Sequence, residues 1–184
     1  MTSLIILAVI ALFIAFYGVG IYNKLVRKRS MMDEGWSGID VQLKKRYNLI
    51  PNLVETVKGY AKHEQETLNK VIEARNSAMN AEGAKAQTQA QNQLQSALAN
   101  VFALSEAYPD LKANTNFLQL QNELSDIEND VEKARRYYNA TVRENNILVE
   151  SFPSNLVANS FSFFLGEFFE IEEEGQRANP KVQF

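Results

Sequence analysis

Residues 43–55 read LKKRYNLIPNLVE, with Pro51 in the middle of a helical pattern. Apolar side chains recur there at spacings of three and four residues, at Leu43, Tyr47, Ile50 and Val54. The later members of the same stripe are Val57, Ala61, Glu64, Leu68, Val71, Arg75 and Ala78. Proline lacks the N–H that would bond the carbonyl of Tyr47, so it either kinks a helix or ends it. The continuous stripe favours one long helix kinked at Pro51; the alternative is a helix that ends near Asn48 and a second that begins at the proline.

An uncharged stretch precedes this pattern. Residues 4–22 read LIILAVIALFIAFYGVGIY, and no charged side chain occurs between Met1 and Asn23. At about 1.5 Å of rise per residue, this run nearly crosses a hydrocarbon core of about 30 Å. It lacks the preceding positive charge and the cleavage site of a signal peptide. We therefore predict a retained transmembrane anchor over residues 1–23; the alternative is a buried core helix of a soluble protein.

Basic residues lie only on the C-terminal side of the anchor. They are Lys24, Arg27, Lys28 and Arg29. The positive-inside rule then places the body of the protein in the cytoplasm and the amino terminus outside. Such a cluster also attracts anionic lipid headgroups by about 1 kcal/mol per residue, although its role in setting topology suffices to explain it.

Three further segments with helical periodicity follow the first stripe. They span residues 84–108, 117–152 and 154–171. Gly83 marks the turn before the first of them, Pro109 closes it, and Asp110 is the predicted cap of the next helix. The second segment ends at Phe152, because the following Pro153 biases that residue away from helix.

Helices with one apolar face must bury those faces against one another. The predicted fold is therefore all-α, with a single N-terminal transmembrane helix that continues into an elongated up-and-down four-helix bundle. The expected domains are the anchor at residues 1–23, a helical body at residues 24–171 and a flexible acidic tail at residues 172–184.

The predicted helices differ in length. The first, over about residues 24–80, would be about 87 Å long, whereas the second would span only about 36 Å. Either the first helix is broken at Pro51 or its membrane-proximal part packs on other copies, and we prefer the second. The candidate oligomer contacts are the small residues Ala11, Ala15 and Gly18 of the anchor, then Met32, Trp36 and Ile39, and finally Phe163 and Phe169 in the last helix.

The last predicted helix carries more apolar surface than one bundle face requires. Its extra apolar side chains favour a neighbour, either another subunit or a membrane surface. No Lys or Arg occurs between residues 154 and 171, and Glu167 and Glu170 are present, which weakens the membrane alternative.

The residue types present exclude several kinds of active site. Cysteine is absent, so disulfides and thiolate metal ligands are excluded. His63 is the only histidine, and residue 67, where an H-E-x-x-H zinc motif needs its second histidine, is a threonine. Ser37, Asp40 and His63 lack the nucleophile elbow of a hydrolase triad. We therefore expect no catalytic residue, metal or cofactor, and the net charge of −3 favours no nucleic-acid partner.

Asn145 differs from its neighbours because it lies on the apolar stripe of residues 117–152. One polar side chain at such a position can fix helix register or oligomeric state. The alternative is a hydrogen bond to a neighbouring backbone group or to water.

Seven segments carry a family resemblance: YNKLVRKR at 22–29, GWSGIDVQLKKRYNLIPNLVETVKGYAKHE at 35–64, AR at 74–75, YPDLKA at 108–113, FLQLQNEL at 117–124, ARRYYN at 134–139 and FPSNLVA at 152–158. In this order behind an amino-terminal anchor, they resemble the LemA family of bacterial membrane-anchored helical proteins. The resemblance implies a single-pass anchor, a four-helix body and no established enzymatic activity. It also implies a repeated tyrosine–asparagine pair; here the first is Tyr138–Asn139, but the second reads Asn145–Asn146.

These observations predict a non-enzymatic scaffold of the bacterial cytoplasmic membrane that self-assembles and organises or shapes that membrane. Its partners would be membrane lipid and other copies of itself. The alternative is an adaptor or chaperone-like partner of another membrane protein, such as a membrane protease, that acts as one or a few copies. Within the family, some members are associated with internal membrane organelles and others are found beside membrane proteases.

Overall fold

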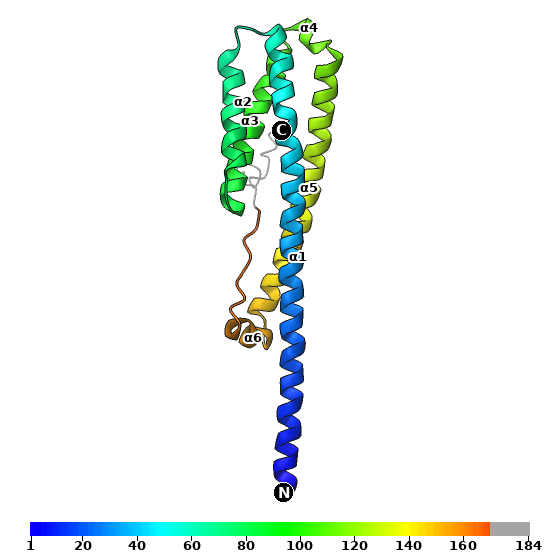
Figure 1. Cartoon of the computed structure of the whole chain (residues 1–184), viewed down its shortest axis with the longest axis vertical. Helices are drawn as coiled ribbons and strands as arrows, with labels where there is room; N and C mark the ends of the chain where they lie inside the picture. Colours follow the sequence, from blue (N-terminus) through cyan, green and yellow to red (C-terminus); the bar gives the residue numbers. More distant parts are fainter. Residues whose placement is uncertain (170–184) are drawn as a thin grey trace, which may run out of the picture. The chain divides into compact units, whose positions relative to one another are not determined.

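The computed structural model describes residues 1–169, which contain helices and no strand (Figure 1). The helices are α1 (Thr2–Tyr60), α2 (Gln65–Met79), α3 (Ala84–Ser105), α4 (Pro109–Lys112), α5 (Thr115–Glu150) and α6 (Ser154–Ser160). The prediction of an all-α chain that begins with a long apolar helix is confirmed. The tail predicted at residues 172–184 lies outside the described residues.

α1 passes through Pro51 without a break, as the continuous stripe predicted. The helix ends at Tyr60, however, so the prediction that it runs on to about residue 80 is wrong. The chain turns at residues 61–64, and α2 folds back along α1, where the Tyr47 hydroxyl donates to the Ala78 carbonyl over 3.2 Å. The apolar stripe keeps its phase across the turn because α1 and α2 face the same core.

α5 begins at a cap that was not predicted from the sequence. Asp110 was predicted to cap this helix, but it lies in the first turn of the short helix α4. The cap is Asn114, whose Oδ1 accepts a hydrogen bond from the Phe117 N–H over 3.0 Å. α5 itself agrees with the predicted helix over residues 117–152 to within two residues at each end.

α6 is shorter than predicted, because a left-handed residue stops it. The predicted helix over residues 154–171 ends at Ser160, and Ser162 has φ +56°. The Phe163 N–H donates to the Ala158 carbonyl over 3.0 Å, which is the backbone bond of a Schellman helix end. Apolar spacing beyond Ser160 therefore did not indicate helix.

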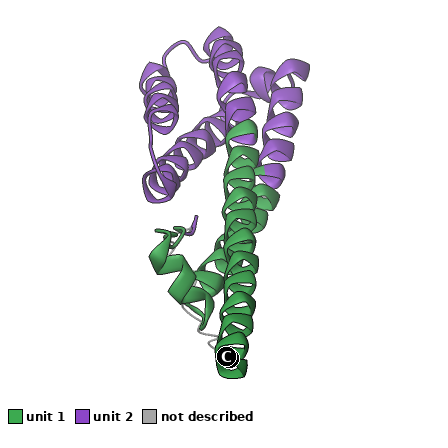
Figure 2. Cartoon of the chain, turned by 60° about the horizontal axis from the view of Figure 1, so that its bottom comes forward, with its two compact units in different colours: residues 1–41, 131–167 green, residues 42–130, 168–184 purple. Residues whose placement is uncertain are grey.

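The chain divides into two compact units (Figure 2). The first comprises residues 1–41 and 131–167, and the second consists mainly of residues 42–130. One hydrophobic cluster of the first unit consists of Leu25, Val149 and Ala158, with the partly buried Ile21, Leu148, Val157 and Phe163 packed around it. The same unit also buries Ile39, Val131 and Val142.

The second unit is built from four longer helical segments and the short α4. The segments are the end of α1, α2, α3 and the start of α5. Its fully buried side chains include Ile50, Leu53, Val57, Leu94, Val101, Leu111 and Phe117. These are not the four helices predicted for the bundle: the first predicted helix supplies both α1 and α2, and the predicted fourth helix belongs to the other unit.

Candidate functional site

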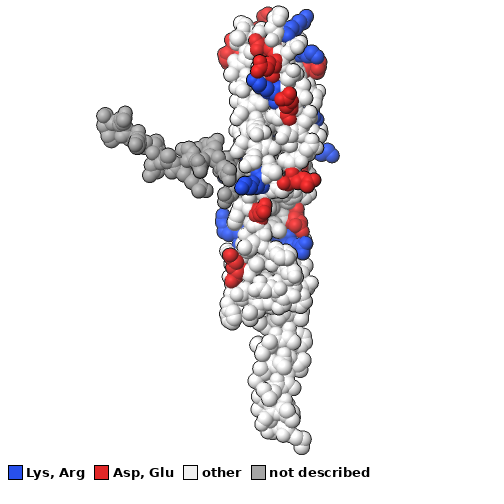
Figure 3. Space-filling model, turned by 90° about the vertical axis from the view of Figure 1, so that its left-hand side faces the viewer, with Lys and Arg blue, Asp and Glu red and all other residues white. Residues whose placement is uncertain are grey.

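The first turns of α1 have the composition of a membrane span and lie exposed. An 18-residue window of this helix has a mean hydropathy of 2.8, and none of it is buried. Large apolar side chains such as Phe13 and Phe16 are about three-quarters exposed, at 73% and 76%. Figure 3 shows no charged side chain over this lower end of the face drawn. By length and composition, α1 can cross a membrane.

α6 and the residues after it pack against the last apolar turns of α1. The Tyr22 ring meets Phe161 and Phe163 edge to face, with ring centroids 4.9 and 5.6 Å apart. A hollow of about 380 Å³ lies beside these rings and is lined by Ala15, Gly18, Val19, Tyr22, Val157 and Phe161. The end of the apolar stretch thus has a lateral partner from the other end of the chain.

Residues 161–167, here called the strap, are not helical and rely on α5 for hydrogen bonds. Tyr138 Oη donates to the Glu167 carbonyl over 2.8 Å, and Asn145 Nδ2 donates to the Phe164 carbonyl over 3.2 Å. Asn146 pairs with both backbone groups of Gly166: its Oδ1 accepts from the N–H over 2.8 Å and its Nδ2 donates to the carbonyl over 3.0 Å. These side chains supply partners that a neighbouring strand would otherwise provide.

The strap passes close to α1 at Gly166, where a larger residue would require the flexible side chain of Met32 to shift. A Cβ atom at Gly166 would overlap the sulfur of Met32 and lie 3.4 Å from Val142 Cγ1.

Burial raises the pKa of Tyr138, and the nearby carboxylates of Glu167 and Asp33 act in the same direction, so its hydroxyl stays a hydrogen-bond donor.

A second polar cluster lies in the second unit, around the Tyr47 carbonyl that faces Pro51. The proline leaves the Tyr47 carbonyl without its helical donor, and Arg75 Nε of α2 donates to that carbonyl over 2.8 Å. The same guanidinium donates to Asn76 Oδ1 over 3.2 Å. A side chain thus replaces the missing N–H, and α1 continues past the proline.

The Tyr47 hydroxyl extends this cluster to α3 and α5. It accepts a hydrogen bond from Gln91 Nε2 and lies 2.8 Å from the side-chain amide of Gln87. Gln91 Oε1 accepts from Arg46 over 2.9 Å, and Arg46 also lies 3.0 Å from a carboxylate oxygen of Glu128. We call these residues, together with Arg75, the polar node.

Arg46 is the most deeply buried charge of the polar node, with 3% of its surface exposed. Burial lowers the pKa of Arg46, and the Glu128 carboxylate acts in the opposite direction. Only Arg46 of this pair is buried, because 36% of the Glu128 side chain is exposed. Arg46 thereby links α1 to α5 through Glu128 and to α3 through Gln91.

Comparison with known proteins identifies the family. A model of the LemA family matches residues 35–184. The chain belongs to the LemA family. A similar protein is the Protein LemA of Metamycoplasma hominis (strain ATCC 23114), 28% identical over 159 residues that cover 86% of this chain and 73% of that relative. The family resemblance drawn from the sequence is thus confirmed.

The part of the chain that matches the LemA model contains both polar features. Residues 35–184 include the polar node and the strap with its α5 partners, whereas the apolar stretch and the basic cluster precede the match. Asn145–Asn146 departs from the LemA pattern, and the pairing of Asn146 with Gly166 was not predicted from the sequence. The available signal was an uncharged, aromatic-rich stretch after Pro153 with a glycine in it.

The predicted membrane-proximal basic residues do not all have the same surroundings. Lys24, Arg27 and Arg29 are exposed, whereas Lys28 forms an ion pair with Glu144 of α5. The hydrogen bond from Lys28, and then its charge, hold the pKa of Glu144 below its ordinary value. The pair therefore stabilises the fold above the ordinary pKa of a glutamate, and this contribution is lost as the pH falls through the lowered value.

The residues predicted to contact other copies lie at different depths. Ala11 and Ala15 are exposed and Gly18 is half-buried, while Met32, Trp36 and Phe163 are half-buried and Ile39 and Phe169 are buried within the chain. The Trp36 ring meets Tyr138 edge to face at 5.3 Å. Contacts of Ile39 or Phe169 with another copy would require this chain to rearrange, so the anchor face is the accessible part of the prediction.

Asn145 is 1% exposed, and its amide bonds the Phe164 carbonyl. The structure thus shows the hydrogen bond to backbone that was one of the two interpretations from sequence. A role of this residue in fixing oligomeric state stays a prediction.

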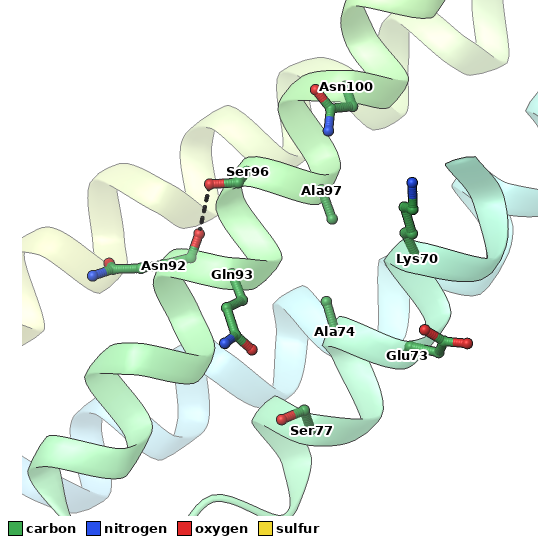
Figure 4. Close-up of a pocket in the computed structure, with 9 residues that line it drawn as sticks. All are labelled: Lys70, Glu73, Ala74, Ser77, Asn92, Gln93, Ser96, Ala97 and Asn100. Carbon is green, nitrogen blue, oxygen red and sulfur yellow. Dashed lines mark hydrogen bonds between the residues drawn. The ribbon is translucent and has the colours of Figure 1, made fainter. Parts of the chain in front are cut away.

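Among the described residues, no group of three or more His, Asp or Glu side chains is arranged to hold a metal ion. His63 lies exposed in the turn between α1 and α2. The larger concave feature is an open groove of about 600 Å³ between α2 and α3 (Figure 4). Its walls carry small and polar side chains, among them Ala74, Ser77 and Ala97.

Proposed function

We propose that this protein is a non-enzymatic, self-assembling scaffold of the bacterial cytoplasmic membrane. Residues 1–23 span the membrane with the amino terminus outside, and the helical body lies in the cytoplasm. Copies associate laterally and thereby organise or shape the membrane around them.

The observation that carries this proposal is the continuity of α1. The exposed apolar turns and the buried turns from Leu25 onward belong to one helix with no linker between them. Association of anchors in the bilayer would therefore bring the attached bodies together at a defined angle. Membership of the LemA family is consistent with an anchored helical body.

The anchor offers a route for that association. Ala11, Ala15 and Gly18 share one helix face, and small residues let two membrane helices approach closely. A Cβ atom added at Gly18 or at Gly20 meets no neighbouring element within 4 Å, and Gly20 points away from this face. The two glycines form a matched pair for testing.

The test compares Gly18→Ile with Gly20→Ile in the full chain. Particle size after gentle solubilisation is measured by light scattering and electron microscopy over a range of protein concentrations. We expect Gly18→Ile to shift the protein to smaller species and Gly20→Ile to keep the wild-type size. Wild-type protein that is monomeric at every concentration in native-like lipid would overturn the scaffold proposal.

A second candidate function, an adaptor for another membrane protein, is favoured by the groove between α2 and α3. Small side chains on both walls, such as Ala74 and Ala97, leave room for an inserted side chain, and Lys70 and Glu73 at its edge can pair with charges of either sign (Figure 4). Ala74→Trp would fill the groove. Loss of a co-purifying membrane protein in this variant, with particle size unchanged, would support the adaptor.

A further inference from the structure

The chain after α5 exposes more apolar surface than a water-facing segment normally does. Residues 151–166 carry no charged side chain. The large apolar side chains that they expose are Phe152 (80%), Leu156 (58%), Phe161 (62%), Phe164 (78%) and Leu165 (52%). So many exposed large apolar side chains within one uncharged segment indicate a partner or a membrane.

The position of this segment along α1 favours the membrane over a protein partner. Val157 and Phe161 line the hollow together with Ala15, Gly18 and Val19, which belong to the uncharged stretch of α1. At about 1.5 Å per residue, positions 18–22 lie within about 8 Å of the end of that stretch. This depth corresponds to the boundary between lipid headgroups and acyl chains, where amphipathic segments lie.

We propose that residues 151–166 form an interfacial membrane segment. Their exposed aromatic and aliphatic side chains enter the leaflet from which α1 emerges. The inference rests on the proposed function in one respect, namely that α1 spans the membrane.

Charge also favours lipid as the partner of residues 151–166. The segment itself lacks Lys and Arg, which weakened the membrane alternative when the sequence was considered alone. In the structure its neighbour α1 supplies the exposed Lys24, Arg27 and Arg29 just beyond the hollow, where headgroup phosphates would lie. The apolar side chains and the basic side chains thus come from two elements of one unit.

The absence of cysteine allows a direct test, because single-cysteine variants of the full chain can each be labelled at one place. Variants Phe164→Cys and Leu156→Cys probe the segment, and their side chains are exposed, so folding should survive. Leu118→Cys is the matched control, an exposed apolar position on the second unit, and Ile10→Cys reports the anchor. Each carries an environment-sensitive fluorophore and is reconstituted in phosphatidylcholine–phosphatidylglycerol vesicles.

Quenching is measured with spin-labelled lipids whose nitroxide lies either near the headgroup or in the middle of the acyl chain. We expect the labels at 156 and 164 to be quenched at least about twofold more by the shallow nitroxide than by the deep one. The label at 118 should be quenched by neither, and the label at 10 most strongly by the deep nitroxide.

The outcomes separate this inference from the proposed function. If the label at 10 is not quenched, α1 does not span the bilayer and the proposed function itself fails. If that label is quenched while those at 156 and 164 behave like the one at 118, the inference is overturned and the anchor stands. If the labels at 156 and 164 are shielded from water only at high protein-to-lipid ratio and without lipid quenching, a second copy covers the segment and the inference is likewise overturned.

Discussion

The guanidinium of Arg75 takes the place of a backbone donor that Pro51 cannot provide. The acceptor is the carbonyl of Tyr47, which Pro51 cannot bond because proline has no N–H, and which Arg75 bonds instead in a part-buried setting. The sequence held a signal for this pairing, because Arg75 is a charged residue on an otherwise mostly apolar stripe. That signal indicates a buried partner without identifying it.

This pairing predicts a thermodynamic coupling between positions 51 and 75. Arg75→Ala should lower the free energy of unfolding by about 1–3 kcal/mol, because it leaves a carbonyl unsatisfied. In a Pro51→Ala background the new N–H can bond the same carbonyl, so the cost of Arg75→Ala should fall by about 1 kcal/mol. Urea unfolding followed by circular dichroism measures all four proteins of this cycle.

Arg136→Ala is the control for loss of an arginine. Arg136 pairs with Glu132 on the exposed face of α5, and its removal should change the free energy of unfolding by less than about 0.5 kcal/mol. An identical cost of Arg75→Ala in both backgrounds would mean that the guanidinium does not serve the proline's carbonyl.

At the scale of elements, apolar periodicity predicted α3 and α5 well, because each helix buries one continuous stripe. It failed at residues 61–64, since a chain that reverses onto the same core keeps the phase of its stripe. It failed again after Ser160, where Phe161, Phe164 and Phe168 recur at helical spacing in a chain that is not helical. Partners from α5 decide that conformation, and no local pattern in the sequence reveals them.

The strap depends on Asn146, and this dependence can be measured. Asn146→Ala removes both hydrogen bonds to Gly166. At about 0.5–1.5 kcal/mol for each bond, local opening of the strap should become about fivefold to about 150-fold more frequent. Hydrogen exchange at the Gly166 amide, read by mass spectrometry of the full chain in detergent, should accelerate accordingly.

Asn129→Ala on the exposed face of α5 serves as the comparison, with no change expected in exchange at Gly166. Exchange at Gly166 that is equally fast in the wild type and in Asn146→Ala would show that the side-chain pairing does not hold the strap.

At the scale of the whole molecule, the candidate membrane span and the all-α class followed from composition and periodicity alone. The division into two units did not, because it depends on which distant segments pack together. Residues 131–167 join the start of the chain, whereas residues 42–130 pack with one another. Sequence periodicity identifies buried faces but does not say which faces meet.

The proposed orientation belongs to this scale, and we expect the basic residues after the anchor to set it. A reporter that works only in the cytoplasm, fused after Phe184, should be active. The reason is that the basic residues Lys24, Arg27, Lys28 and Arg29 are expected to keep the C-terminal side of the anchor in the cytoplasm. Replacing these four by serine, with lysines added before Leu4, should reduce the activity severalfold. Recovery of an active periplasmic reporter at the same site in the unaltered protein would reverse the assigned topology.

The discontinuous first unit has a consequence for synthesis. The ribosome releases residues 1–41 early, but their partners in residues 131–167 follow only after the intervening segment has been made. At about 5–20 residues per second this delay is about 5–20 s. During that interval the packing partners of Leu25, namely Val149 and Ala158, have not yet been made. Residues 42–130 pack mainly with one another, so their packing partners are complete at the end of it. The first unit can therefore be completed only after all residues of the intervening segment have been made.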